Sequence, residues 1–297
     1  VPDDISVVGF DGIPMADYYN PKLTTVRQRY QTMAQRSLEI LFRTIDLKTK
    51  AVHEIIPFEL ALGESVRENN LVCRRNLIMR TSGILMHISS LPSPYGIGTM
   101  GKEARKFVDF LDKSGQTYWQ ILPICPTSYG DSPYQSFSSF AGNPYFIDLD
   151  YLCKDKLLTK KECLSYEWGE NPEFVEYGTL YENRFPLLKK AYQRFKKALP
   201  DDFADFCEKN SDWLEDYALF MALKDANGGV AWFEWKKDLK LRKPSAIENA
   251  KEEFADAVEF WKMLQYLFFK QWTELKAYAN EKGIQIIGDV PIYVAGD

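Results

Sequence analysis

Apolar positions along the first 68 residues form two short runs with a helical stripe between them. Residues 5–10 form an apolar run that ends at Asp11-Gly12, which predicts a buried strand followed by a turn. Apolar side chains recur at helical spacing over residues 34–45, which predicts an amphipathic helix. Residues 55–62 predict a second strand. The pattern is typical of the end of an α/β sheet domain, and about 65 residues are too few to build a full core.

After residue 80 the pattern becomes an alternation of short apolar strands and helices. Residues 83–88 and 117–124 form apolar runs, and residues 101–111 between them place their apolar side chains on one helical face. A strand, a helix and a strand at this spacing predict a βα repeat with parallel strands and a right-handed crossover. An apolar stripe over residues 254–275 predicts a long helix, and residues 284–287 predict a third strand.

These elements favour an α/β fold, the opening of a (β/α)8 barrel. A complete barrel needs about 250 residues, so only its first three strands are expected in residues 81–297. Charged, aromatic-rich helical segments over about 150–250 predict a helical subdomain inserted into this incomplete barrel. Residues 69–80 have no clean period and are interpreted as a junction between residues 1–68 and the barrel.

Composition and charge exclude several classes of protein. The net charge of −5, from 37 Lys+Arg and 42 Asp+Glu, provides no basic surface for a phosphate backbone, so no nucleic-acid partner is expected. Five cysteines without CxxC spacing and two histidines offer little for a metal site, and no metal is expected. No apolar run approaches about 18 residues, and the first residues are unlike a signal peptide. We therefore expect a cytoplasmic protein with no membrane contact, and no protein partner is inferred.

One segment carries most of the candidate chemistry. The sequence YGDSPYQSFS at 129–138, followed by GNPY at 142–145, combines tight turns, hydroxyls, amides and aromatic rings. Sugar sites use aromatic faces against pyranose C–H groups and fixed polar groups for the hydroxyls. The high aromatic content, 14% of the chain, fits either sugar stacking or an aromatic core, and for the cluster at 232–235 core packing is favoured.

The amino-terminal residues resemble a known family. VPDDISVVGFDGIPMADYYNPKLTTVRQ at 1–28 and IIPFELALGESVRE at 55–68 resemble the carboxyl end of a lac-repressor-type, sugar-responsive regulator, whose effector domain is periplasmic-binding-protein-like. The resemblance implies that Asp11 lies in an effector cleft; alternatively, Asp11 only begins a turn. The DNA-binding helix-turn-helix of that family is absent from residues 1–68, so operator binding is not expected.

The rest of the chain resembles a second family. RTSGILMHISSLPSPYGIG, WQILPICPTSYGDSPYQSFSSFAGNPYFIDLD and GDVPIYVAGD resemble the amino-terminal part of amylomaltase, the disproportionating 4-α-glucanotransferase of glycoside hydrolase family 77, over about residues 80–297. Family members transfer α-1,4-glucan segments between maltooligosaccharides by a retaining double displacement, without a cofactor. The fusion of the two families is either real or the product of a regulator gene running into its neighbour.

The resemblance implies substrate contacts at four positions. Tyr134 matches a tyrosine that packs against the glucose on the donor side, and Ser132 matches a hydroxyl that binds sugar. Asp289 matches an aspartate that holds sugar hydroxyls beside the reacting carbon, and Tyr129 matches an outer glucan contact. The alternatives are a buried Tyr134 ring and a Ser132 that only shapes its turn. Asp131 is expected to brace the loop.

No catalytic residue is assigned in this chain. The family's nucleophilic aspartate belongs to an Arg-x-Asp-His-Phe-Arg-type motif that does not occur before Asp297, and its acid/base glutamate lies later still. His87, at the end of the first barrel strand, is given no role. We therefore expect an inactive part of a glucanotransferase, poorly soluble because of its open sheet edge. The alternatives are a fragment of a sugar-responsive transcriptional regulator and a non-catalytic glucan-binding module.

Overall fold

The computed structural model describes residues 8–9, 22, 24–27, 29, 32, 35–37, 39–40, 59–63, 81–128, 130–171, 173–291 and 293–296. Residue contacts divide the chain into two compact units. The first comprises Val1–Met79 and Ile287–Val290, and the second comprises Arg80–Ile286 and Pro291–Asp297.

The first unit contains a three-stranded sheet in the order β1-β2-β3. β1 (Val8–Gly9) pairs in parallel with β2 (Thr24–Arg27), and β2 pairs antiparallel with β3 (Glu59–Ala61). The buried Thr24 hydroxyl accepts a hydrogen bond from the Gly63 N–H at 3.0 Å. This bond ties β2 to the residues that follow β3.

Two of these strands and the helix agree with the sequence pattern. β1 and β3 lie within the apolar runs 5–10 and 55–62, and the described residues 35–37 and 39–40 are helical. β2 was not predicted, because Thr-Thr-Val-Arg contains a single large apolar side chain and therefore no apolar run. Asp11, the predicted effector contact, lies outside the described residues.

The second unit contains a sheet in the order β4-β5-β7. β4 (Gly83–Leu85) pairs in parallel with β5 (Tyr118–Gln120), and α2 (Lys102–Lys113) connects them. β7 (Gln285–Ile287) lies beside β5, where the Gln285 N–H donates to the Thr117 carbonyl at 2.9 Å. A second parallel pair joins β6 (Gln135–Ser136) to β8 (Tyr293–Val294).

The predicted βα repeat is confirmed by β4, α2 and β5. α2 buries Ala104, Val108 and Leu111, the face that its apolar spacing predicts. Beside that face, the Phe107 ring meets the fully buried Trp119 ring of β5 edge-on at 5.2 Å. Parallel strands need such a crossover, and packing of its apolar face on the sheet stabilises it.

Helices occupy most of the chain between β6 and β7, as predicted for residues 150–250. The helices that follow α2 are α3 (Leu149–Lys154), α4 (Lys160–Leu164), α5 (Tyr177–Phe195), α6 (Phe203–Lys209), α7 (Leu214–Ala226), α8 (Lys237–Lys240), α9 (Pro244–Glu253) and α10 (Ala255–Glu281). The short 3-10 helices are η2 (Ile88–Ser90), η3 (Pro144–Phe146) and η4 (Trp232–Glu234).

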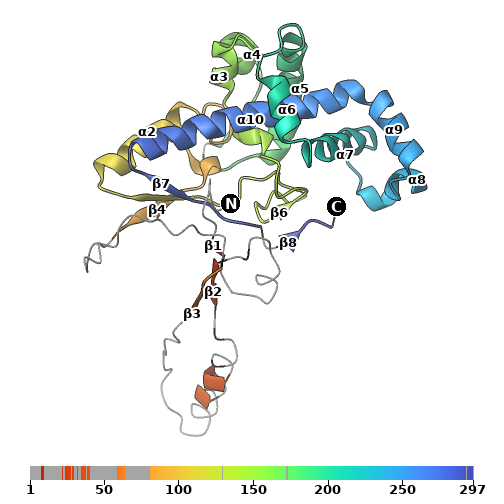
Figure 1. Cartoon of the computed structure of the whole chain (residues 1–297). Coiled ribbons are helices and arrows are strands. Elements are labelled where there is room, and N and C mark those ends of the chain that lie inside the picture. The colour runs from red at the N-terminus through yellow and green to blue at the C-terminus, as the bar shows by residue number, and fades with distance from the viewer. Residues whose placement is uncertain are drawn as a thin grey trace. The chain divides into compact units, whose positions relative to one another are not determined.

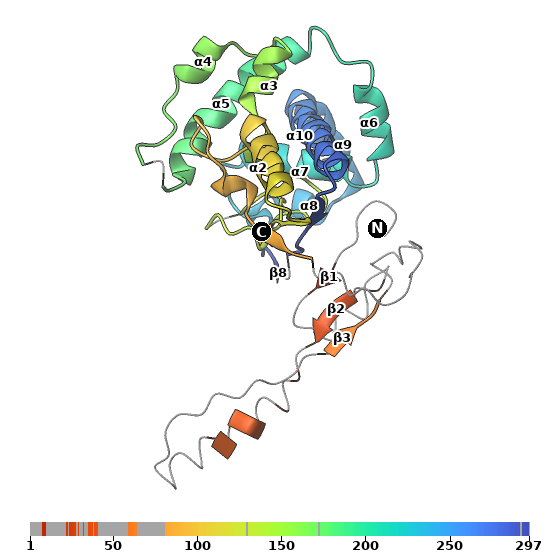
Figure 2. The same ribbon diagram turned by 90° about the vertical axis from the view of Figure 1, so that its left-hand side faces the viewer.

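The 27-residue helix α10 is central to the second unit. It packs against α2, α5, α6, α7 and α9, and Figures 1 and 2 both show it running beside α2 over the sheet. The stripe predicted over 254–275 faces these neighbours. After the helix, Gly283 takes the left-handed conformation with φ of 75°, which only glycine adopts without strain, and the chain turns into β7.

The aromatic cluster at 232–235 departs from the predicted core packing. Trp235 is buried and its ring packs against Phe220 at 5.5 Å, as expected. Trp232 and Phe233, however, are 41% and 48% exposed. The prediction is therefore wrong for these two side chains, because the short η4 turn directs them outward.

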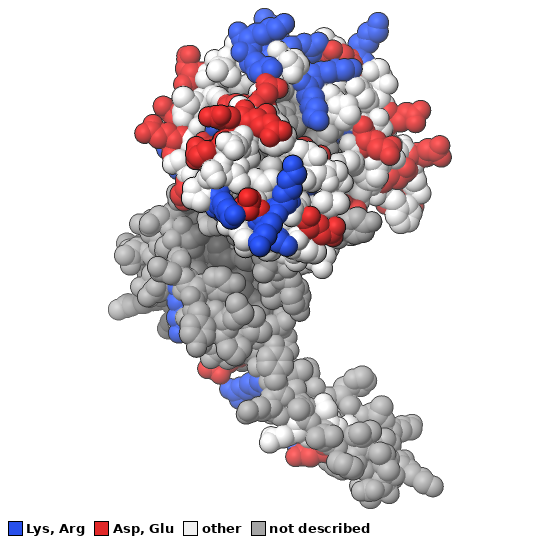
Figure 3. All heavy atoms as spheres, turned by 90° about the vertical axis from the view of Figure 1, so that its right-hand side faces the viewer, with Lys and Arg blue, Asp and Glu red and all other residues white. Residues whose placement is uncertain are grey.

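The described surface carries charges of both signs. On the face shown in Figure 3, lysine and arginine side chains are interspersed with aspartate and glutamate. Among the described residues, Arg242 forms an ion pair with Asp216 at 2.8 Å. Of the helices in the described part of the chain, none combines the length and the apolar character needed to cross a bilayer.

Candidate functional site

A pocket of about 140 Å³ lies where β4 and β5 end. The chain leaves β4 through His87 and η2, and it leaves β5 through Leu122-Pro123. The residues that line the pocket are His87, Ser89, Ser90, Leu122, Pro123, Thr127, Asp131, Pro133, Asn143, Phe146 and Tyr177. The carboxyl ends of parallel strands are the usual place for a ligand in an α/β sheet.

Part of the wall is the loop that carries the YGDSPYQS motif. Its two arms are joined by a bridge between Thr127 and Ser136 and by a hydrogen bond from the Ser128 N–H to the Gln135 carbonyl at 3.0 Å. At its tip, Gly130 and Asp131 both have positive φ, 92° and 55°. A left-handed aspartate is uncommon, and here it reverses the chain so that Asp131 lines the pocket.

Ser132 and Tyr134 flank Pro133 on this loop. Both side chains are half-buried, and the Ser132 hydroxyl accepts a hydrogen bond from the Tyr134 N–H at 3.3 Å. The hydroxyl therefore shapes the turn. Pro133 lines the pocket, whereas Ser132 and Tyr134 do not belong to its lining. The sugar contacts of these two residues stay a prediction.

Asp289 follows β7 and is half-buried. Its carboxylate accepts a hydrogen bond from the N–H of Val290 at 2.8 Å. Asp289 belongs to the stretch Ile287–Val290, which groups with the first unit, and its convergence with Tyr134 on one sugar ring stays a prediction. Tyr129, the fourth predicted contact, lies outside the described residues.

Asp131 contributes more to the pocket than the sequence indicated. Its N–H donates to the Ser128 carbonyl at 3.0 Å, so its backbone braces the loop as expected. Asp131 also lines the pocket, however, and burial raises the pKa of its carboxyl group. The pKa of the Tyr177 hydroxyl across the pocket is also raised, first by burial and then by the negative charge of Asp131.

His87 also lines the pocket. It is only 8% exposed, and its ring meets Phe146 edge-on at 5.3 Å. Burial lowers the pKa of the imidazole to about 4, so His87 is neutral near pH 7. Its Nδ1 has no hydrogen-bond partner among the described residues. The sequence signal for both His87 and Asp131 was their position, at a strand end and at a turn.

The segment after the motif loop is held in place by α10. Gln265 accepts a hydrogen bond from the Gly142 N–H at 2.7 Å and donates one to the Gly142 carbonyl at 3.0 Å. Gln271 makes the same pair of bonds to the Asp148 backbone, at 2.7 and 3.3 Å. A Cβ at position 142 would lie 2.0 Å from the Phe268 ring, so this contact requires glycine. The Asn143 and Phe146 walls of the pocket lie between these two anchors.

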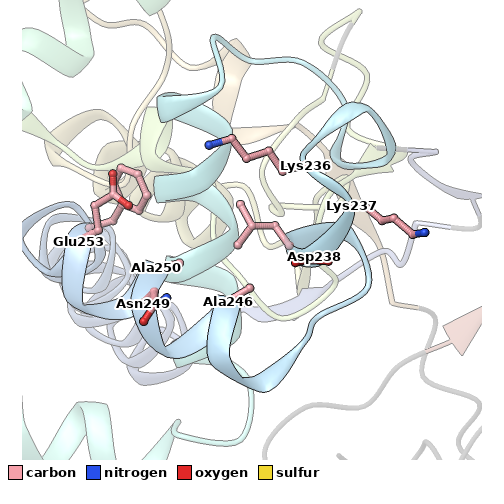
Figure 4. A pocket seen from close by; sticks show the side chains of 9 residues that line it. Lys236, Lys237, Asp238, Ala246, Asn249, Ala250 and Glu253 are labelled. Atoms are coloured by element: carbon pink, nitrogen blue, oxygen red, sulfur yellow. The ribbon is translucent and has the colours of Figure 1, made fainter.

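A second pocket, of about 390 Å³, lies between α8 and α9. Figure 4 shows Lys236 and Lys237 extending in different directions around it. Its carboxylate Asp238 is already paired with Lys243 at 2.6 Å. None of the motif residues contributes to this lining. In the part of the chain that the structure describes, no group of three or more His, Cys, Asp or Glu side chains is arranged to hold a metal ion.

The fold and the pocket together define an α/β protein with a polar pocket at the carboxyl ends of its parallel strands. The sequence model of 4-alpha-glucanotransferases, glycoside hydrolase family 77, matches residues 86–297, and the chain belongs to this family. Residues 1–66 match the family of periplasmic binding protein-like domains. Both resemblances are thereby confirmed at the level of the family.

Individual relatives agree with this assignment. The chain is 55% identical over 212 residues to a 4-alpha-glucanotransferase of Clostridium butyricum. The aligned residues make up 71% of this chain and 44% of the relative. It is 50% identical over 226 residues to one from Thermus thermophilus, with 73% and 43% covered. The chain thus spans less than half the length of these relatives.

Solved structures show the same fold. The amylomaltase of Streptococcus agalactiae, solved in complex with acarbose, superposes with a TM-score of 0.71 at 46% identity, covering 73% of this chain and 44% of that one. The amylomaltase of Corynebacterium glutamicum superposes with a TM-score of 0.53 at 17% identity, over 72% of this chain and 30% of that one. At this identity the similarity supports the fold and nothing further.

Proposed function

We propose that this chain is part of a 4-α-glucanotransferase that moves α-1,4-glucan segments between maltooligosaccharides. The observation that carries the proposal is the polar pocket at the ends of β4 and β5, which the YGDSPYQS loop helps to line, in a chain that belongs to glycoside hydrolase family 77. The reaction is a retaining double displacement, in which a carboxylate attacks the anomeric carbon and an acceptor sugar completes the transfer.

The proposed organisation follows the two family matches. Residues 1–68 are the end of a regulator effector domain, and residues 69–80 are a junction. Residues 81–297 are the first three strands of a (β/α)8 barrel, with a helical insertion over about 150–250. The parallel pair β4 and β5, connected by α2, supports this proposal.

The residues of this chain supply substrate contacts in the proposal. Tyr134 packs against a glucose ring, Ser132 and Asp289 bind its hydroxyls, and Tyr129 contacts the glucan further out. Transfer exceeds hydrolysis only when an acceptor is positioned and water is excluded, and a shaped aromatic and polar surface serves both needs. The nucleophile and the acid/base are assigned to no residue here. We further propose a cytoplasmic location.

Binding to α-1,4-glucan tests the proposal on the chain itself. In a native gel that contains soluble starch, we expect the chain to migrate more slowly than in a gel that contains dextran, an α-1,6-glucan. Asp289→Asn and Tyr134→Ala should each reduce the retardation. Equal mobility of the unchanged chain in both gels would contradict the proposal.

Activity is tested in a chimera. Residues 86–297 replace the matched segment of the Clostridium butyricum relative, and the product is incubated with maltotriose. We expect glucose and maltopentaose, and we expect Asp289→Ala in the chimera to abolish both. A folded chimera that releases neither glucose nor maltopentaose would contradict the proposal that residues 86–297 are part of a glucanotransferase.

A second candidate function rests on the match of residues 1–66 to periplasmic binding protein-like domains. In this alternative the first unit binds a sugar effector, with Asp11 as a contact, and the chain is a fragment of a sugar-responsive regulator. The starch-gel assay on residues 80–297 alone separates the two candidates. Retained binding favours the glucanotransferase, and binding lost with residues 1–79 favours the sensor.

A further inference from the structure

We infer that Cys153 and Cys163 form a modification site, a dithiol that closes reversibly to a disulfide between α3 and α4. The oxidant belongs to the class of small disulfides, of which glutathione disulfide is an example, and an excess of thiol reverses the reaction. The two cysteines lie outside the lining of the pocket at the ends of β4 and β5. The inference therefore does not depend on the proposed function.

The two thiols are already in contact. Cys153 lies in α3 and Cys163 in α4, two helices that pack on each other and lie side by side in Figures 1 and 2. Their Sγ atoms are 3.6 Å apart and share a hydrogen bond, and both thiols are free. A disulfide bond is about 2.05 Å long, so the sulfurs need to approach by about 1.5 Å, which is within the reach of side-chain rotation.

Both helices are held by contacts that do not involve the sulfur atoms. Lys160, at the start of α4, pairs with Asp150 of α3 at 2.7 Å. Glu162, next to Cys163, accepts hydrogen bonds from both terminal nitrogens of Arg194 on α5, at 2.8 and 2.6 Å. The folded chain therefore holds one thiol against the other. This raises the effective concentration of the second thiol and favours a disulfide within the chain over a mixed one.

Exposure decides the order in which the two thiols react. Cys153 is partly exposed, whereas Cys163 is fully buried, so Cys153 is the one that an oxidant in solution reaches. Burial raises the pKa of both thiols, and the hydrogen bond between them lowers the pKa of Cys153 and raises that of Cys163. Because the thiolate is the nucleophile, this hydrogen bond also favours Cys153 as the first attacking sulfur.

The oxidation consists of two exchange steps. The Cys153 thiolate attacks one sulfur of glutathione disulfide, which forms a mixed disulfide and releases one glutathione thiolate. Cys163 then loses its proton, and its sulfur attacks Cys153 Sγ. This step forms the bond between α3 and α4 and releases the second glutathione. Two protein thiols are thereby oxidised, one small disulfide is reduced to two thiols, and the two cysteine protons pass to the glutathione thiolates.

The bond stabilises a segment that adjoins the pocket wall. It closes the loop between positions 153 and 163, which restricts the unfolded chain. α3 begins directly after Asp148, and Asn143 and Phe146 of the pocket lining come shortly before it. We expect the midpoint of thermal unfolding to lie about 5–10 °C higher in the oxidised chain than in the reduced chain.

The test is equilibration of the full chain in mixtures of glutathione and glutathione disulfide, followed by acid quenching. Peptide mapping without reduction should find Cys153 joined to Cys163, and dithiothreitol should restore both thiols. Cys163→Ser should stop at the mixed disulfide on Cys153, whereas Cys153→Ser should leave Cys163 unmodified. Cys207→Ser, which removes a thiol of α6, is the matched control and should form the disulfide as the unchanged chain does.

Three results would overturn the inference. The first is a folded, unchanged chain that keeps both thiols free in glutathione disulfide alone. The second is a mixed disulfide that persists on Cys153 although Cys163 is present. The third is a bond from Cys153 to any other cysteine. Should a serine variant not fold, the peptide map of the unchanged chain decides. None of these results involves glucan binding, so the proposed function stands or fails separately.

Discussion

At the scale of single residues, burial decides the chemistry of the pocket. His87 follows a strand whose apolar residues predict its position but not the chemical state of its ring. Packing against Phe146 withdraws the imidazole from water, and this lowers its pKa to about 4 because the charged form loses its hydration. Burial raises the pKa of Asp131 for the same reason, because here the charged form is the carboxylate. Both shifts favour the neutral forms.

The lowered pKa of His87 predicts a pH dependence of stability. The unfolded chain binds a proton at His87 below its ordinary value of 6.5, whereas the folded chain does so only below about 4. The contribution of His87 is therefore complete above pH 6.5 and is lost as the pH falls from 6.5 to 4. The difference in unfolding free energy between the unchanged chain and His87→Phe should shift by about 3 kcal/mol against the unchanged chain between pH 7 and pH 4.

Urea denaturation at pH 7, 5.5 and 4 measures this shift. Other groups that titrate in the same range contribute equally to both chains and cancel in the difference. A difference that is the same at all three pH values would mean that folding does not lower the pKa of His87.

At the scale of secondary-structure elements, the position of the pocket depends on two glutamines of α10. Gln265 and Gln271 are both buried, and each pairs with the N–H and the carbonyl of one backbone position, Gly142 and Asp148. The helix thus satisfies the backbone of an irregular segment in the way that a neighbouring strand would. Without these bonds the segment that carries Asn143 and Phe146 would have unpaired polar groups in the core.

We expect Gln265→Leu to destabilise the chain by about 2–6 kcal/mol. Leucine fills a similar volume but leaves the Gly142 N–H and carbonyl buried without partners, and each such group costs about 1–3 kcal/mol. The measurement is the unfolding free energy in urea. Gln193→Leu, at an exposed position of α5, is the control and should change it by less than about 0.5 kcal/mol. Similar values for the two variants would show that water replaces the lost bonds.

At the scale of the whole molecule, the hydrophobic core belongs to the second unit. The buried apolar side chains of the described residues all lie between Ile88 and Ile284. In the described residues of the first unit, the buried side chains are those of Thr24 and Thr25. Burial of apolar surface is the main favourable contribution to folding, so most of the stability of the described chain resides in the second unit.

Residues 80–297 produced alone should therefore keep the cooperative thermal transition of the whole chain, with a midpoint within a few degrees. Residues 1–79 produced alone should show none, because about 80 residues of this pattern bury too little apolar surface. Circular dichroism at 222 nm against temperature measures both. Loss of the transition in residues 80–297 would place essential contacts in the removed segment.

Local periodicity was sufficient to predict the helices α2 and α10 and the strands β1, β3, β4, β5 and β7. The spacing of apolar residues reflects which side chains face the core at a period of 3.6 or 2, and this is a property of neighbouring residues. For that reason α2, α10, β4, β5 and β7 were predicted close to their observed bounds. β2 was not predicted, because only one of its four residues has a large apolar side chain. The two-residue strands β6 and β8 were not predicted either. The family was likewise visible in contiguous motifs.

The pocket depended on contacts between distant residues. Gln265 meets Gly142 across 123 positions of the chain, and His87 meets Phe146 across 59. No local pattern encodes such meetings, because they arise when whole elements pack and exclude water. The sequence could therefore indicate Tyr134, Ser132 and Asp289 through their motifs, but Asp131 and His87 emerged only when packing surrounded them. The shifts of their pKa values are consequences of desolvation, which exists only in the folded chain.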